Sequence, residues 1–205
     1  MSSQSAHPGF IRNFQLYFLT RTEGITFFIM IPLTVLYMAV NLSLDERQFR
    51  LMLICAVAAS VFSFIGTTIN NMLVILPINR FFRKIVSGED ADDDTYARAL
   101  GRFLRLPFIH SIGAVIRWIV GLAIFILPFQ ILAGLNGYQA ANLWILLLID
   151  PPLAGVLYFL LSEIYLQRIY NHGVFIRTAS HGFTRRMNLR FKLMMFAVVT
   201  MFVPF

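Results

Sequence analysis

The sequence predicts an all-α membrane protein, a bundle of helical hairpins that crosses the bilayer several times. Of the 205 residues, 58% are hydrophobic and 13% are charged, whereas soluble domains carry about 25% charged residues. The mean hydropathy is +0.72. The apolar residues gather in long runs without charges, and these runs approach or exceed the ~20 residues that a helix needs to cross a bilayer.

Four runs and part of a fifth meet this length requirement. Pro77 is expected to end the second span, because proline interrupts the hydrogen bonding of a helix. The third span is followed by turn residues at 134–137. The chain therefore divides into a cytoplasmic tail with an amphipathic interfacial helix (1–23), a first hairpin (24–79), a connection (80–108), a second hairpin (109–167), a second connection (168–190) and the start of a fifth span (191–205).

The basic residues favour a cytoplasmic amino terminus. They concentrate in the connections 80–108 and 168–190, and lysine and arginine near span ends stay on the cytoplasmic side. The opposite connections hold only Arg47 and Arg50. We therefore expect a multi-pass membrane protein whose basic residues contact anionic lipid headgroups and not nucleic acid. The residues counted are Arg80, Arg83, Lys84, Arg98, Arg102 and Arg105 in one connection and Arg168, Arg177, Arg185, Arg186, Arg190 and Lys192 around the other.

A weak internal repeat accompanies the hairpins. Leu19, Leu104 and Leu189 lie in short basic and aromatic stretches that are about 85 residues apart, a period that holds one hairpin and one connection. In the first unit an aromatic face, formed by Phe10, Phe14 and Phe18, predicts an interfacial helix. The third unit lacks its second half, so we expect a truncated chain whose parent has six helices. A chance third match is the alternative.

Asp150 is the first candidate for function, because an ionisable group inside hydrocarbon is costly. It lies in the fourth span directly before Pro151 and Pro152, where proline frees backbone carbonyls. Together with Asn70, Asn71 and Thr67 it is expected to shape an intramembrane polar pocket. The alternative is that Asp150 only fixes packing.

A stripe of small and polar residues follows one face of the second span. Its members recur every four residues, which places them on one side of a helix. Such a stripe allows close helix contact and interhelical hydrogen bonds. Packing is favoured over a ligand cavity for the stripe, which consists of Ala59, Ser63, Thr67 and Asn71.

Arg117 and Glu163 are expected to form a structural ion pair. They lie in the third and fourth spans, at depths that an antiparallel hairpin brings together. The pair would neutralise two buried charges and fix the register of the hairpin. Snorkelling of Arg117 toward the headgroups is a further possibility.

The sequence indicates no catalytic residue, metal site or cofactor. The single Cys55 excludes an internal disulfide, and the four histidines have no second ligand at metal-binding spacing. The acidic run 89–94 lacks the glycine and glutamate of a calcium loop and is expected to precede a helix at 95–104. Phosphate loops and nucleophile elbows are also absent.

The organisation resembles a known family. A cytoplasmic amino terminus, the basic-aromatic segment 102–108 and the expected three hairpins are similar to the six-helix membrane anchors of bacterial signalling proteins. These are the anchors of class III adenylate or guanylate cyclases and of methyl-accepting chemotaxis proteins of the spirochaete kind. The resemblance implies a multi-pass protein of the bacterial inner membrane. It also implies a homodimer and a linker helix that leads to a cytoplasmic output domain beyond residue 205.

Three functions follow from these observations. The first is a membrane anchor or sensor module of a signal-transduction protein. The second is a small transporter or channel subunit that uses Asp150 beside the proline pair. The third is a structural subunit of a membrane complex.

Overall fold

The structure is a computed structural model that describes residues 11, 13–171 and 175, and every regular element in this part of the chain is helical. Four helical rods are long and apolar enough to cross a membrane, which confirms the predicted all-helical fold with several long apolar helices. The expected start of a fifth span, 191–205, and Leu189 lie outside the described residues. The first rod consists of three successive elements. These three are α2 (Phe14–Ile25), the π-helical turn η1 (Thr26–Met30) and α3 (Ile31–Asn41). The other three rods are single helices: α4 (Glu46–Val86), α5 (Asp93–Ala133) and α6 (Gly137–Asn171).

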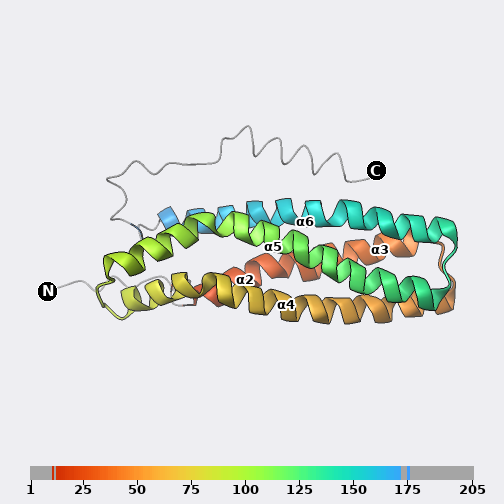
Figure 1. Ribbon diagram of the computed structural model, residues 1–205, viewed down its shortest axis with the longest axis horizontal. Helices are drawn as coiled ribbons and strands as arrows, with labels where there is room; N and C mark the ends of the chain where they lie inside the picture. Colours follow the sequence, from red (N-terminus) through yellow and green to blue (C-terminus); the bar gives the residue numbers. More distant parts are fainter. Residues whose placement is uncertain (1–10, 12, 172–174, 176–205) are drawn as a thin grey trace, which may run out of the picture.

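The four rods lie lengthwise beside one another (Figure 1). α5 packs along α4, α6 packs along α5, and the first rod contacts both α4 and α6. Successive rods run in opposite directions, so the chain makes two helical hairpins. We call the end where α4 passes into α5 the basic end, and the end that holds residues 42–45 and 134–136 the far end.

Turn chemistry accounts for the two connections at the far end. Asp45 caps α4, since its carboxylate accepts the backbone N–H of Gln48 at 2.7 Å. Gly134 ends α5 in the left-handed conformation (φ 60°), which glycine adopts without strain. Asn136 and Gln139 then exchange reciprocal hydrogen bonds at the start of α6, and Gln139 Nε2 donates to the carbonyl of Leu42 at 2.9 Å. The two turns are therefore joined.

Prolines lie inside the helices and do not end them. Pro77 was expected to end its span, but α4 continues to Val86. The residues beyond it, including Phe81 and Phe82, are buried in the bundle, and this packing offsets the lost hydrogen bond. Near the start of α3, Pro32 follows the π-helical turn, whose wider hydrogen bonding accommodates the missing N–H.

Two apolar clusters fill the two halves of the bundle. The cluster near the basic end is aromatic and includes Phe18, Phe82 and Phe103. The cluster near the far end includes Met38 and Phe129. Buried polar side chains lie mainly between these clusters, so the polar interior is enclosed at both ends by apolar packing.

The aromatic face of the first helix packs inside the bundle. We expected it to lie at the membrane interface, but Phe14 and Phe18 are buried. The ring of Phe14 meets that of Phe82 edge-on at 5.1 Å. Because α2 continues directly into the span, its aromatic face lies against α4. The ring contacts formed there position the helix. Phe10 lies outside the described residues.

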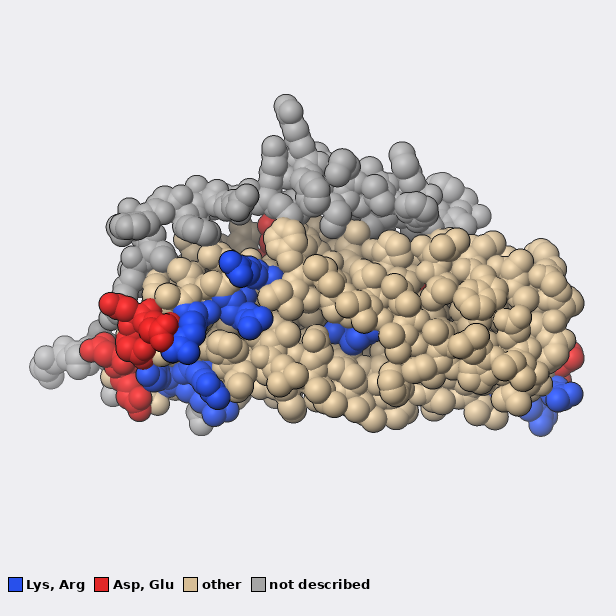
Figure 2. All heavy atoms as spheres, in the orientation of Figure 1, with Lys and Arg blue, Asp and Glu red and all other residues tan. Residues whose placement is uncertain are grey.

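The connection 80–108 is mostly helical, with only residues 87–92 between α4 and α5. The helix expected at 95–104 is the first part of α5, which runs unbroken through Pro107. Figure 2 shows the acidic side chains at the tip of the basic end and a band of Lys and Arg behind them. The long surface beyond is mostly uncharged, with one small patch of Lys or Arg near its middle and a few charged side chains at the far end. The charged side chains on this face therefore gather mainly at the two ends of the bundle.

Candidate functional site

A buried ion cluster lies where α2, η1, α5 and α6 meet. Glu23, near the end of α2, is its centre, with a side chain only 6% exposed. Tyr158 of α6 donates a hydrogen bond to Glu23 Oε2 at 2.5 Å. Because that hydroxyl has a single proton, Thr26 donates in turn to Tyr158. The first helix is thus fastened to α6 through a carboxylate that is out of water.

Two nitrogen groups from α5 face the other oxygen of this carboxylate. Arg117 Nη2 lies 3.6 Å from Glu23 Oε1, and His110 Nε2 lies 3.7 Å from the same atom. On its other side, His110 Nδ1 is 2.8 Å from the hydroxyl of Ser162. If Ser162 donates to Nδ1, the ring proton stands on Nε2 and faces Glu23.

Aromatic rings enclose the cluster. The ring of His110 packs between those of Phe18 and Tyr158, at centroid distances of 5.0 and 4.8 Å. The guanidinium of Arg117 lies 5.4 Å from the centroid of the Tyr158 ring, a cation–π contact. Water is therefore largely kept from three ionisable groups, and their mutual interactions are strengthened.

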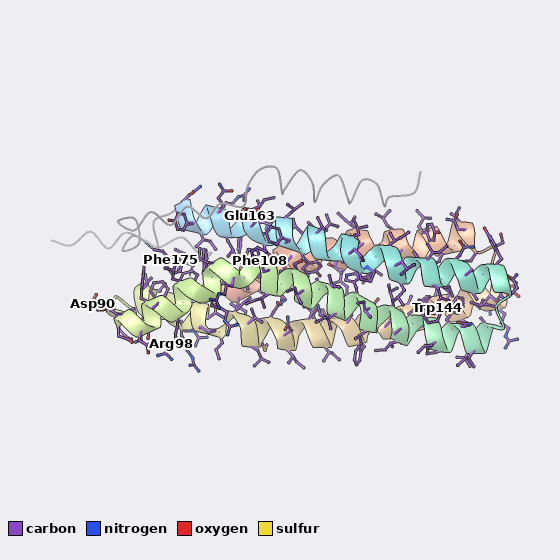
Figure 3. The ribbon with its side chains drawn as sticks, turned by 45° about the horizontal axis from the view of Figure 1, so that its top comes forward. Asp90, Arg98, Phe108, Trp144, Glu163 and Phe175 are labelled. Atoms are coloured by element: carbon purple, nitrogen blue, oxygen red, sulfur yellow. The ribbon has the colours of Figure 1, made fainter. Side chains whose placement is uncertain are left out.

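Arg117 and Glu163 are not partners in this structure, and the carboxylate that faces Arg117 is Glu23. Along the α5–α6 hairpin, Ser111 bonds to the carbonyl of Gly155. Arg117 lies beyond this contact toward the far end and Glu163 beyond it toward the basic end, more than ~10 Å apart along the bundle. Figure 3 shows Glu163 in the half of α6 nearer the basic end. The expected pairing was wrong because hydropathy places a span in the sequence but does not set its register against a neighbour.

The residues of the expected polar pocket are divided between two places. Asp150 is buried and accepts a hydrogen bond from Thr34 of α3 at 3.0 Å. Asn70 lies on the other side, beside Gly113 of α5, where a methyl group added to the glycine would be 3.2 Å from Asn70 Nδ2 and 3.3 Å from Arg117 Nη1. Within the described residues, no hydrogen bond joins Asp150 to Asn70, Asn71 or Thr67. α6 remains helical through its proline pair.

The small and polar stripe of α4 faces the interior. Ala59, Thr67 and Asn71 are buried and Ser63 is half-buried. Ala59 and Ser63 also line a pocket of about 70 Å³ between the first rod, α4 and α5. The lining consists of Thr26, Ile31, Thr34, Val35, Met38, Ala56, Ala59, Ser60, Ser63, Arg117, Trp118, Gly121, Leu122 and Phe125.

Sequence reasoning missed most of the cluster. Glu23 served only as the boundary of a span, and His110 was placed at the membrane interface. A signal was present in the spacing, because Thr22, Glu23 and Thr26 share one face of α2 and η1, and Tyr158 and Ser162 are four residues apart in α6. Among the described residues, no group of three metal-ligating side chains exists.

Comparison with known proteins identifies no relative: no protein-family model, curated protein or solved structure is significantly similar to this chain. The arrangement of its own side chains is therefore the basis for any functional inference.

Proposed function

We propose that the chain is the membrane-embedded sensing module of a signalling protein, and that the Glu23 cluster is its switch. The observation that carries this proposal is the meeting of Glu23, His110 and Arg117 inside an apolar bundle. Ionisable groups within hydrocarbon are expensive and tend to be retained for function. The basic end faces the cytoplasm and its anionic lipids, in keeping with its band of exposed arginines.

The geometry suggests how a signal is transmitted. Glu23 and Thr26 belong to the first rod, whereas their partners belong to α5 and α6. A change in the charge or hydrogen bonding of the cluster therefore changes the interactions that hold the first rod against the second hairpin. The amino-terminal half of the rod reaches the basic end, so its movement presents a different surface to a cytoplasmic output or to a second copy of the chain. The resemblance to cyclase and chemoreceptor anchors remains part of this proposal.

Spin-label distances test the switch. Cys55, the single cysteine, is replaced by alanine, and labels are placed at Leu16 of α2 and Ile164 of α6, which are 61% and 51% exposed. In lipid nanodiscs, Glu23→Gln is expected to shift the distance distribution, because it removes the charge that holds Arg117. Glu46→Gln at the far end is the control and should leave the distribution unchanged. Identical distributions for all three proteins would assign the cluster a purely structural role and contradict the proposal.

A transporter is the second candidate, because Asp150 is buried and its partner Thr34 also lines the pocket. The two apolar clusters at either end would then make this an occluded state. Proton-coupled uptake into proteoliposomes that is abolished by Asp150→Asn would support it. A chain that folds correctly and gives no flux for any tested ion would rule it out.

A further inference from the structure

A groove at the far end lies between the start of α4 and the end of α5. Its volume is about 400 Å³, and its lining consists of Glu46, Arg47, Arg50, Leu51, Ile54 and Leu132. This volume is within the range of small-molecule sites, about 300–1,000 Å³. The charged residues of the lining, Ile54 and Leu132 are all exposed. A molecule outside the bundle can therefore reach the groove.

The groove lies at the depth of phospholipid headgroups. Arg50 and Arg80 are 30 residues apart on α4, or ~45 Å along the helix axis. A bilayer with both of its headgroup layers is about 40–45 Å thick, so the two arginines reach opposite headgroup layers. Leu51 and Ile54 follow Arg50 toward the hydrocarbon. The groove is therefore charged on its outer side and apolar on its inner side.

The lining carries one uncompensated positive charge. Glu46 and Arg50 form an ion pair, whereas Arg47 has no acidic partner among the described residues. Arg47 Nη2 donates to the carbonyl of Leu132 at 3.4 Å, and this contact draws the guanidinium from α4 toward α5. A guanidinium has about five N–H donors, so most of those on Arg47 remain for a ligand. Figure 2 shows charged side chains of both signs at this end.

A phosphodiester matches this charge and these donors. Guanidinium groups bind phosphate oxygens through parallel hydrogen bonds, and the single negative charge of a phosphodiester balances that of Arg47. A phospholipid brings this group to the required depth, together with acyl chains that can cover Leu51 and Ile54. A free phosphate ester would leave the apolar side of the groove empty. Both sides of the groove therefore favour a phospholipid.

We propose that the groove between α4 and α5 at the far end binds one phospholipid, whose phosphodiester accepts hydrogen bonds from Arg47 and whose acyl chain lies along Leu51 and Ile54. The site is separate from the Glu23 cluster and does not depend on the sensing function. Because the bound lipid contacts both helices, it stabilises the folded arrangement of the far end.

Photolabelling locates the lipid. The protein in detergent micelles is mixed with a phosphatidylglycerol analogue that carries a diazirine near the start of one acyl chain. After irradiation, peptide mass spectrometry identifies the labelled residues. Saturable labelling of Leu51, Ile54 or Leu132 is expected. Labelling that is spread over the whole apolar surface, with no saturable component at these residues, would overturn the proposal.

A charge variant tests the phosphate contact. Arg47→Gln should raise the half-saturating concentration of the analogue about 10- to 100-fold, as expected for lost hydrogen bonds from a charged donor. Arg98→Gln is the control, because Arg98 is 67% exposed and already paired with Asp94 at the other end of the bundle. An unchanged half-saturating concentration in a folded Arg47→Gln protein would overturn the role of the phosphodiester.

A second pair of variants tests the groove and leaves Arg47 in place. Leu132 and Ile131 are neighbours near the end of α5 and are 53% and 79% exposed, but only Leu132 lines the groove. Leu132→Trp fills part of the groove and should weaken labelling of α4 at least about 10-fold, whereas Ile131→Trp should not. Saturable labelling of α4 that is unaffected by Leu132→Trp would place the lipid elsewhere and overturn the site.

Competitors identify the group that is recognised. Unlabelled phosphatidylglycerol should displace the analogue. Dioleoylglycerol, which lacks the phosphate, and glycerophosphate, which lacks the chains, should not displace it at equal concentration. Displacement by glycerophosphate would show a site for free phosphate esters, and displacement by dioleoylglycerol would show apolar binding alone. Either result would overturn the assignment to a phospholipid.

Discussion

The Glu23–Arg117 pair is expected to stabilise the bundle far more than an ion pair at its surface. Glu23→Gln leaves the Arg117 guanidinium, whose side chain is 12% exposed, opposite a neutral amide. Breaking a buried pair by removing one partner costs about 3–5 kcal/mol, because the remaining charge is unpaired. Arg117→Gln should cost a similar amount for the converse reason. In the double variant neither charge remains, so the loss should be smaller than the sum of the single losses by about 2–4 kcal/mol.

The chain provides a matched control for this cycle. Glu46 and Arg50 form an ion pair on α4 with side chains that are 80% and 73% exposed. Such pairs are screened by water and contribute about 0.3–0.5 kcal/mol. Both cycles are measured as free energies of unfolding in mixed detergent micelles. A coupling of less than about 0.5 kcal/mol for Glu23 and Arg117, equal to the control, would refute the argument and show that Arg117 is hydrated.

Three further predictions concern single contacts. Tyr158→Phe removes the hydrogen bonds to Glu23 and Thr26 but keeps the ring, and should lower the free energy of unfolding by about 1–3 kcal/mol. Tyr138→Phe, at an exposed position, is the control and should change the free energy of unfolding little. Equal effects of the two substitutions would show that the buried hydroxyl contributes nothing. Gly155→Ala should destabilise the α5–α6 hairpin by about 1–3 kcal/mol, because the added Cβ would lie 2.5 Å from Val115 Cγ2. Adding Val115→Ala to this variant should restore the lost stability. Failure of this rescue would mean that the clash is not the cause. Asp92 caps α5 and bonds to Thr95 and Lys84, and these hydrogen bonds lower the pKa of its carboxyl. The cap is therefore complete above the ordinary carboxyl pKa of about 4 and is lost as the pH falls further. The protection of the Thr95 amide against hydrogen exchange should fall in acid in the native protein, with no such loss attributable to capping in Asp92→Ala.

Hydropathy predicted the spans but not the ends of the helices. Four long apolar runs were enough to indicate a helical membrane bundle, since a bilayer leaves few alternatives. Beyond the apolar runs, α4 and α5 continue as amphipathic helices, where Phe81 and Phe103 pack in one cluster. A hydropathy window averages over this one-sided pattern and assigns it to a connection. Pro77 also gave a wrong prediction of a helix end, because tertiary packing determines whether a helix continues past a proline.

The candidate site depended on helix register, which the sequence did not reveal. Arg117 was singled out as a costly buried charge, and its expected partner was selected from the adjacent span. The actual partner lies 94 positions earlier in the chain. The side chain of Arg117 slants toward the start of its helix, as side chains in helices do, and this brings it to the level of Tyr158. Only the packed arrangement of all four rods brings these residues together.

Solid-state NMR of the protein in lipid bilayers tests the cluster most directly. With ¹³C-labelled glutamate and ¹⁵N-labelled arginine, the account predicts a cross-peak between a glutamate carboxyl carbon and an arginine side-chain nitrogen that disappears in both Glu23→Gln and Arg117→Gln. The peak should persist in Glu46→Gln and in Glu163→Gln. A peak from Arg117 that survives in Glu23→Gln and disappears in Glu163→Gln would contradict the account, because the hairpin would then be closed by its own ion pair and the first rod would not be fastened to it.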